Sequence, residues 1–259
     1  MIFDSHMHIG SLGAQYGVSL DAAGLVERMR ENAIDAGALF APENEAVREV
    51  VESVPGIYGL YWANPRVPGV LEEARAYLGH PGFVGIKLHP TLDGYPADVP
   101  ALDPYLEVAA EAGRPVAVHS APGDADPKHI RRLAERHPTV PVILYHTYLG
   151  PAEGRRRAVR YLGDHPNLYL ETSWCRWRTV VRFVEQVGPD RVLFGSDASV
   201  DGPAHYRRQP PNVEGAETYN DGLLALVGAL GPEATRAVLA ENTRRVFRLD
   251  EPAGQSNVR

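Results

Sequence analysis

One pattern constrains the fold more than any other feature: a short apolar run followed by an amphipathic stretch, repeated eight times. Strands that alternate with helices lie parallel and are joined by right-handed crossovers. The apolar runs predict strands at Ile2–His8, Ile34–Ala41, Ile57–Asn64, Phe83–His89, Pro115–His119, Val140–His146, Asn167–Ser173 and Arg191–Asp197. Eight units in 259 residues favour an α/β fold closed as a (β/α)8 TIM barrel, which typically has roughly 250 residues. An open doubly wound sheet is the alternative, but its glycine-rich phosphate-binding fingerprints are absent.

Apolar residues recur at helical spacing between these runs. The predicted helices are Asp21–Asn32, Glu43–Ser53, Val70–Leu78, Ala101–Ala112, Pro127–His137, Ala152–Leu162, Thr179–Val187, Tyr219–Leu230 and Pro232–Leu249. Ser19 is placed to cap the first helix, and Gly113 follows the fourth at the usual glycine position. No linker divides the chain, so we predict one domain over residues 1–250 and a flexible C-terminal tail over 251–259.

Charge and cysteine usage narrow the function classes. The formal net charge is −7 and basic residues are scattered, whereas nucleic-acid binding needs a basic surface. The single cysteine, Cys175, excludes an intrachain disulfide and fits a reducing cytoplasm. No stretch has the features of a signal peptide or a membrane span. We therefore expect a cytoplasmic protein without nucleic-acid or membrane partners, and a homo-oligomer is compatible with the sequence.

The ten histidines divide by their position along the predicted strands. Four lie within or at the ends of helices, where we expect structural roles: His80, His129, His137 and His165. Five end a predicted strand and one follows the eighth strand: His6, His8, His89, His119, His146 and His205. The C-terminal ends of barrel strands converge on one mouth, where active sites are built. The sequence therefore predicts a histidine-rich site at this mouth.

A subset of these residues has the chemistry of a metal site. His6 and His8 are two residues apart on one strand and so share a face. Asp197 ends the eighth predicted strand, which neighbours the first in a closed barrel, and His119 reaches in from the opposite wall. Three imidazoles and a carboxylate suit a borderline divalent cation. We expect one divalent metal ion per chain, zinc first, with manganese and iron as alternatives.

Several of these motifs resemble the amidohydrolase superfamily, and in particular its amidohydrolase-related branch, also called amidohydrolase 2, which includes aminocarboxymuconate-semialdehyde decarboxylase. The resemblance extends from the second residue to near the end of the chain. The segments that carry it are Asp4–His8, Gly85–Pro90, Val118–His119, Tyr145–His146, Phe194–Asp197 and Glu241–Phe247. It implies that His6, His8, His119 and Asp197 bind the metal, and that His146 is the catalytic histidine beside it. Because a carboxylate ligand also faces the metal-bound water, we expect Asp197 to act as the catalytic base.

The sequence departs from the usual branch pattern in two loops. Thr147–Leu149 follows His146 where a glycine-rich turn is common, and no proline follows Asp197 within a few residues. Both loops face the substrate, so these departures bear on the substrate rather than on the metal site.

Lys87 lies on the fourth predicted strand in phase with His89, so we expect both at the site. In another amidohydrolase branch, a carbamylated lysine on this strand bridges two metals. The alternatives are a buried lysine paired with a carboxylate, or one that contacts substrate. We assign Lys87 and His89 to substrate binding, because the branch resembles mononuclear enzymes.

The end of the seventh predicted strand supplies further candidates. Ser173 is a candidate wall of the site, and Glu171 a candidate partner for an imidazole N–H. Arg176 and Arg178 follow, and arginine forks recognise carboxylates, which suggests an anionic substrate. The unpatterned connection Ser199–Thr218 carries His205, which we assign to substrate binding within a lid over the metal.

The predicted function is that of a metal-dependent hydrolase acting on a small, carboxylated substrate. By this prediction a metal-activated water cleaves an amide, lactam or lactone. A metal-dependent decarboxylase (a lyase) keeps the same site and changes the reaction. Decarboxylases of the branch tend to carry an inserted segment after the first strand, and only Ile9–Val18 stands there. A catalytically inactive barrel that serves as a binding protein is the alternative of a different class.

Overall fold

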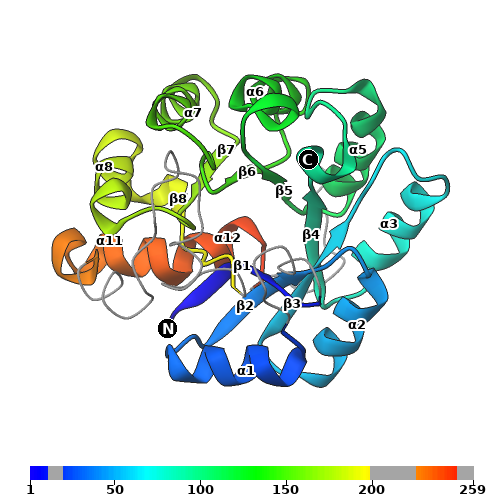
Figure 1. The fold of residues 1–259 in the computed structure, drawn as a ribbon, viewed down its shortest axis with the longest axis horizontal. Helices are drawn as coiled ribbons and strands as arrows, with labels where there is room; N and C mark the ends of the chain where they lie inside the picture. Colours follow the sequence, from blue (N-terminus) through cyan, green and yellow to red (C-terminus); the bar gives the residue numbers. More distant parts are fainter. Residues whose placement is uncertain (11–19, 199–225, 250–259) are drawn as a thin grey trace.

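The computed structural model describes residues 1–10, 20–198 and 226–249. Eight parallel strands form one sheet in the order β1 to β8, so each strand neighbours the next in sequence (Figure 1). The strands are β1 (Phe3–His8), β2 (Ala36–Phe40), β3 (Ile57–Trp62), β4 (Phe83–Leu88), β5 (Val116–His119), β6 (Val142–Tyr145), β7 (Leu168–Glu171) and β8 (Val192–Leu193). All eight predicted strands are confirmed.

Backbone hydrogen bonds join the two ends of the sheet. Ser5 N donates to Phe194 O at 3.0 Å, and Asp197 N donates to the carbonyl oxygen of His6 at 2.8 Å. Further along, His8 N donates to Ala198 O at 2.7 Å. The predicted (β/α)8 barrel is therefore confirmed, with the segment after β8 lying beside β1.

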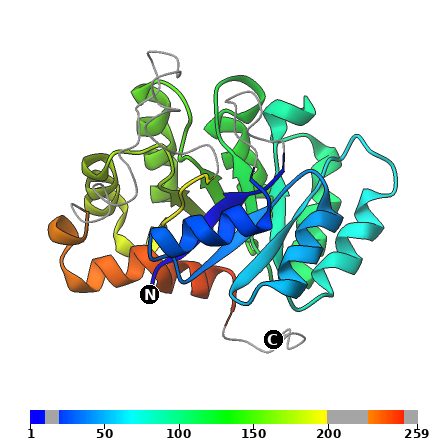
Figure 2. The same cartoon turned by 60° about the horizontal axis from the view of Figure 1, so that its bottom comes forward.

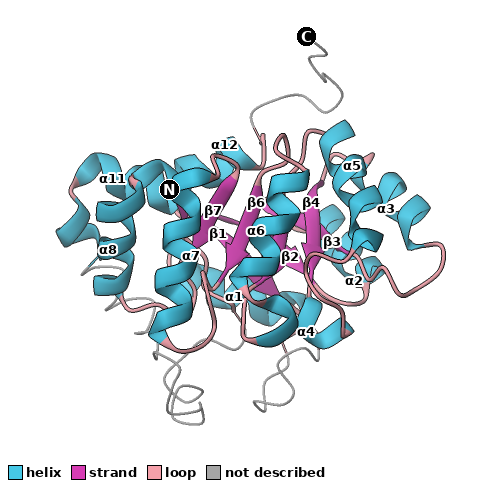
Figure 3. Ribbon diagram, turned by 90° about the horizontal axis from the view of Figure 1, so that it is seen from above, coloured by secondary structure: helices cyan, strands magenta, loops and turns pink. Residues whose placement is uncertain are grey.

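Helices surround the barrel, one after most strands (Figure 3). They are α1 (Ala22–Glu31), α2 (Asn44–Ser53), α3 (Val70–Leu78), α4 (Pro90–Asp93), α5 (Asp103–Glu111), α6 (Pro127–Arg136), α7 (Ala152–Asp164) and α8 (Trp177–Val187). Short 3-10 turns are η2 (Pro100–Leu102), η3 (Gly123–Ala125) and η4 (Pro189–Arg191). None of the helices in the described part of the chain is long and apolar enough to cross a bilayer.

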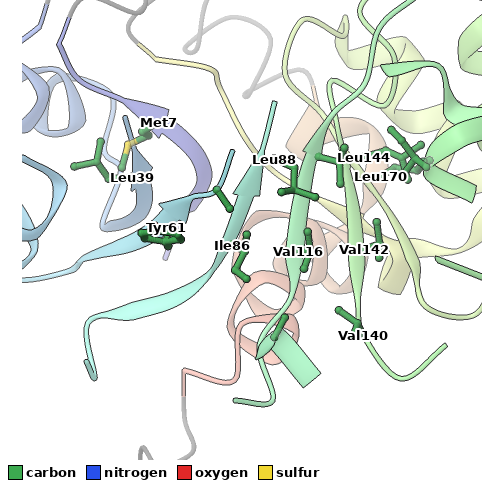
Figure 4. Close-up of a cluster of buried hydrophobic side chains, with 14 of the residues drawn as sticks. Met7, Leu39, Tyr61, Ile86, Leu88, Val116, Val140, Val142, Leu144 and Leu170 are labelled. Carbon is green, nitrogen blue, oxygen red and sulfur yellow. The ribbon is translucent and has the colours of Figure 1, made fainter. Parts of the chain in front are cut away.

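Two layers of apolar side chains flank the strands. One layer fills the barrel and includes Phe3, Phe40 and Ile143. The other packs between the strands and the helices, and Figure 4 shows its strand side, including Met7, Leu39, Tyr61, Ile86, Leu88, Val116, Val142, Leu144 and Leu170. Because strand residues alternate between faces, Ile86 and Leu88 pack outward and the intervening Lys87 points inward.

The last described helices lie below the strands in the view of Figure 2. Residues 226–230 are helical, as predicted, and α11 (Pro232–Arg236), a π-helical segment η5 (Ala237–Glu241) and α12 (Asn242–Val246) follow. Phe247 is fully buried in the inner layer, and Arg114 donates from Nη1 to the Phe247 carbonyl oxygen at 2.5 Å. This segment closes the N-terminal end of the barrel. The predicted tail at 251–259 lies outside the described residues.

Helix-end predictions had mixed outcomes. Gly113 follows α5 with a φ of 65°, as expected for a glycine that ends a helix. The Ser19 cap was wrong, because α1 is capped by Asp21, whose carboxylate accepts from Gly24 N at 2.8 Å. A carboxylate next to the first helical residue reaches the free N–H groups directly.

Candidate active site

An irregularity in β1 directs two histidines into the barrel. The pairing register of β1 with β2 shifts between Asp4 and Met7. Met7 then packs outward, whereas His6 and His8 face the cavity. Such bulges commonly re-aim side chains beside active sites. The carboxylate of Asp4 supports the irregularity by accepting from His6 N at 3.0 Å.

The sequence predicted that Asp197 ends the eighth strand, and this prediction was wrong. Strand β8 stops at Leu193, and Asp197 has a φ of 63°. Its position is set by Asp4, whose carboxylate accepts from Ser196 N at 3.0 Å and from Ser196 Oγ at 2.5 Å. Trp174 Nε1 donates to Asp197 Oδ2 at 2.6 Å. One carboxylate oxygen is thereby held by an indole, and the other is left for the cavity.

That other oxygen lies between two imidazoles. His6 Nε2 is 2.9 Å and His8 Nε2 is 3.3 Å from Asp197 Oδ1. Ligand atoms about 2.0–2.2 Å from one cation are roughly 3.0–3.5 Å apart, so these separations fit neighbouring ligands of one ion. Two imidazole nitrogens and a carboxylate oxygen are also a suitable donor set for zinc, manganese or iron. The residues present therefore fit a divalent metal.

A second group of possible ligands overlaps the first. One ligand atom from each of His6, His146 and Glu171 lies within 4.8 Å of the others, so this group could also hold a metal ion. Glu171, however, already accepts from His6 Nδ1 at 2.9 Å and from the His146 backbone N–H at 2.8 Å. We therefore interpret Glu171 as a hydrogen-bond partner of the imidazoles, as its position in the sequence suggested, rather than as a ligand.

Three imidazoles occupy the opposite wall. His119 Nδ1 is 3.1 Å from His146 Nε2. The ring of His119 stacks on that of His89 with centroids 4.0 Å apart, and His89 stacks on Trp62 at 5.2 Å. His89 Nδ1 also accepts from Leu92 N at 3.3 Å. The structure thus brings His119, His146 and His89 to the same cavity as His6 and His8.

The histidines of the site have different pKa values, which depend on burial and on nearby charges. Burial lowers the pKa of His119 to about 3, and the Lys87 ammonium acts in the same direction. Burial likewise holds the pKa of His146 well below its usual value. Burial also lowers the pKa of His6, but Asp197 and Glu171 outweigh it and leave that pKa raised. His119 and His146 are therefore neutral at pH 7, as metal-binding imidazoles must be.

The cavity has a volume of about 300 Å³, and it combines the polar cluster with apolar walls. Its lining residues are His6, His8, Phe40, Lys87, His89, Thr91, Leu92, His119, Ala121, His146, Leu149, Trp174 and Asp197. Pockets with a few convergent polar groups in apolar walls are typical of small-molecule sites.

Lys87 brings a positive charge into this cavity. Its Nζ lies 4.3 Å from the centroid of the Tyr145 ring and 4.9 Å from that of Phe40. None of the described carboxylates forms an ion pair with it. Burial lowers the pKa of Lys87 to about 7, and Asp197 and Glu171 only partly oppose this. The amine is therefore partly protonated at neutral pH, and an anionic ligand beside it would favour the charged form.

The remaining predicted residues lie elsewhere. Ser173 is buried behind His146 and does not line the cavity. Arg176 and Arg178 are exposed at the start of α8, with the Arg178 guanidinium 5.0 Å from the Trp177 ring centroid. Neither arginine lines the cavity formed by the described residues. His205 and the predicted lid lie outside the described residues.

Backbone strain is concentrated at this mouth. Within residues 1–10, 20–198 and 226–249, six non-glycine residues have positive φ. Three of them line the cavity, His146, Trp174 and Asp197, and Thr147 directly follows His146; these four have φ between 54° and 64°. Such conformations are held only where the surroundings fix them, and they gather at functional sites. Sequence reasoning missed this feature and the roles of Asp4 and Trp174.

The family model described as amidohydrolase, amidohydrolase 2, matches residues 15–249. This chain belongs to the amidohydrolase family. His6 and His8 precede the matched residues of this amidohydrolase, so their interpretation depends on their position on β1 beside Asp197. Comparison with curated proteins finds no significant match.

Solved structures show the same fold at low identity. A 4-oxalomesaconate hydratase from Rhodopseudomonas palustris is 18% identical, with a TM-score of 0.65 and 96% of each chain covered. A probable 2-pyrone-4,6-dicarboxylic acid hydrolase from Acinetobacter baumannii is 16% identical, with a TM-score of 0.68 and coverage of 95% and 99%. A 2,6-dihydroxybenzoate decarboxylase is 16% identical, with a TM-score of 0.69 and coverage of 97% and 99%. The amidohydrolase fold thus accompanies three reaction types.

Proposed function

We propose that the protein is a metal-dependent hydrolase that cleaves an amide, lactam or lactone in a small carboxylated substrate. The observation that carries this proposal is the convergence of His6 Nε2 and His8 Nε2 on Asp197 Oδ1. A site that gathers two imidazoles and a carboxylate at the mouth of a family barrel is suited to a metal and its bound water.

The proposed ligands of one divalent ion, with zinc expected, are His6, His8, His119 and Asp197. When bound, such an ion would polarise a carbonyl and lower the pKa of water to about 7. Burial of the ligands excludes competing solvent, and the hydrogen bond between His6 and Glu171 orients one imidazole.

Two residues would handle protons and charge. Among the described residues, the Asp197 carboxylate contacts nitrogens of His6, His8 and Trp174. We propose that this anion takes a proton from water and passes it to the departing nitrogen or oxygen. His146 lines the cavity beside His119, where the lone pair of its neutral imidazole would orient the attacking water.

Lys87 supports an anionic substrate. It supplies a buried amine beside apolar walls, and a small carboxylate bound there would favour its protonated form. The names of all three structural relatives specify carboxylic acids or their anions. We propose Lys87 as the group that holds the substrate carboxylate, with His89 as a neighbouring contact. The predicted contacts from Arg176, Arg178 and His205 stay proposals.

Replacement of Lys87 by Met is expected to raise KM roughly 10- to 100-fold, because a hydrogen bond to a charged group contributes about 1.5–3 kcal/mol. Steady-state kinetics on the Lys87→Met, Arg176→Met and Arg178→Met variants would compare the three cations directly. An unchanged KM in Lys87→Met, with a raised KM in either arginine variant, would move the anion site to the start of α8.

Decarboxylation is the second candidate, and Lys87 favours it as well, because a decarboxylase also binds a substrate acid. A panel of lactones, amides and carboxylic acids, followed by mass spectrometry with CO₂ detection, separates the reactions. The proposal predicts products that have gained one water. Release of CO₂ would assign decarboxylation, and turnover of no compound by metal-loaded protein would favour a binding role.

A further inference from the structure

We infer that Glu171 is a positioning residue that sets which nitrogen carries the proton in His6, His146 and His119, with Ser173 as the relay to the last two. Each link in this network is a hydrogen bond between buried side chains. The inference rests on the proposed function only in supposing that the free imidazole nitrogens serve a metal and a substrate.

The contacts of Glu171 are with donors. Its Oε2 accepts from the His146 backbone N–H at 2.8 Å, and its Oε1 accepts from the Ser173 backbone N–H. Both are groups that can only donate. The Ser173 hydroxyl donates to Oε2 at 2.7 Å, and His6 Nδ1 lies 2.9 Å from the same atom. A fully buried carboxylate among these groups is an acceptor, so His6 carries a proton on Nδ1.

The serine passes this constraint to His146. Because the single hydroxyl proton of Ser173 is directed to Glu171, its oxygen is left as an acceptor. His146 Nδ1 lies 2.8 Å from that oxygen and therefore donates to it. In a neutral imidazole the other nitrogen then has a lone pair. His146 Nε2 is the nitrogen so defined.

The same logic reaches His119. Its Nδ1 is 3.1 Å from His146 Nε2, which now accepts, so His119 Nδ1 carries the proton. The lone pair of His119 is thus on Nε2. One carboxylate at the end of β7 therefore places an N–H on the Nδ1 of three histidines. It leaves the Nε2 lone pairs of His6 and His119 for a metal, whereas the Nε2 lone pair of His146 accepts from His119.

Gly195 packs directly against Glu171 and leaves no room for a side chain. A Cβ at residue 195 would lie 2.5 Å from Glu171 Oε1 and 2.8 Å from the Cβ of His6. Only glycine lets the segment before Asp197 pass this close to the carboxylate. The network is thus packed against the segment that supplies Asp197.

The experiment is ¹⁵N NMR of the imidazoles in the full-length protein, because protonated and lone-pair nitrogens have distinct shifts. Wild type is expected to show His146 protonated on Nδ1. Ser173→Ala removes the acceptor of the Nδ1 proton and should shift His146 toward the Nε2-protonated form. Ser173→Thr keeps the hydroxyl and should give the wild-type spectrum. Thr172→Val is the matched control, because the Thr172 hydroxyl is also buried and its hydrogen bonds within the described part of the chain are with Gly195 backbone atoms.

Metal affinity provides the second readout, with Zn²⁺ as the probe in a chelator competition. Glu171→Gln should weaken Zn²⁺ binding about 10- to 100-fold, the usual effect of removing a partner that orients a ligand. Ser173→Ala should change it far less, while lowering kcat at unchanged KM. If Glu171→Gln does not fold, the serine variants still decide the assignment.

Two results would overturn the inference: His146 retaining its Nδ1 proton in Ser173→Ala, or Glu171→Gln folding with wild-type imidazole spectra and Zn²⁺ affinity. Failure of the wild-type protein to bind Zn²⁺ or another divalent metal would instead contradict the proposed function. In that case the NMR comparison still tests the proton positions on its own.

Discussion

Asp197→Asn is expected to lower kcat by about 10²- to 10⁴-fold, the usual contribution of a positioned proton-transfer group. The amide keeps an oxygen near His6 and His8 but cannot accept the proton, so metal content should fall only in part. Rate and metal content are measured on the same preparation, by steady-state kinetics and elemental analysis.

Asp93→Asn is the matched control. Asp93 also accepts an indole N–H at the mouth of the barrel, from Trp62 Nε1 at 3.1 Å. None of the described imidazoles forms an ion pair with it. Its variant should therefore keep near wild-type activity. An Asp197→Asn enzyme as active as the Asp93→Asn enzyme would eliminate Asp197 as the base.

His119→Asn is expected to lose metal and activity together, because it removes one of three proposed imidazole ligands. His146→Asn is expected to lose most activity and retain much of the metal, since His146 lies beside the proposed ligands. His137→Asn controls for loss of a histidine, because His137 pairs with Asp103 at the other end of the barrel, 2.8 Å away. Elemental analysis and initial rates report on all three variants.

The His119→Asn and His146→Asn variants also distinguish the proposed ligand set from the alternative group that contains Glu171. If His6, His146 and Glu171 held the ion, His146→Asn would purify without metal and His119→Asn would retain it. That reversal would replace the proposed ligand set.

The sequence predicted the barrel well because the strand pattern is local. Alternation of apolar runs with helical patterns defines all eight strands. In a closed barrel, a histidine at the C-terminal end of a strand lies at the mouth where the active site is built. His6, His8, His119 and His146 were therefore predicted to share one cavity, and they line it. The partnership of Glu171 with an imidazole followed from the same reasoning.

Other features depend on contacts between segments far apart in sequence. Asp4 supports the segment before Asp197 across the join between β1 and β8, and Trp174 reaches Asp197 from the end of β7. The pairing register that makes these contacts is fixed only when the barrel closes. The shortened β8 has the same origin, because the chain bends away after Leu193 to place Asp197.

The most direct test of the account is an anomalous-difference map from crystals of the metal-loaded protein, collected at the absorption edge of the bound metal. We predict one peak per chain, about 2.0–2.2 Å from nitrogens of His6, His8 and His119 and from an oxygen of Asp197. No peak, a peak bounded instead by His146 and Glu171, or two peaks bridged by a carbamate on Lys87 would contradict it.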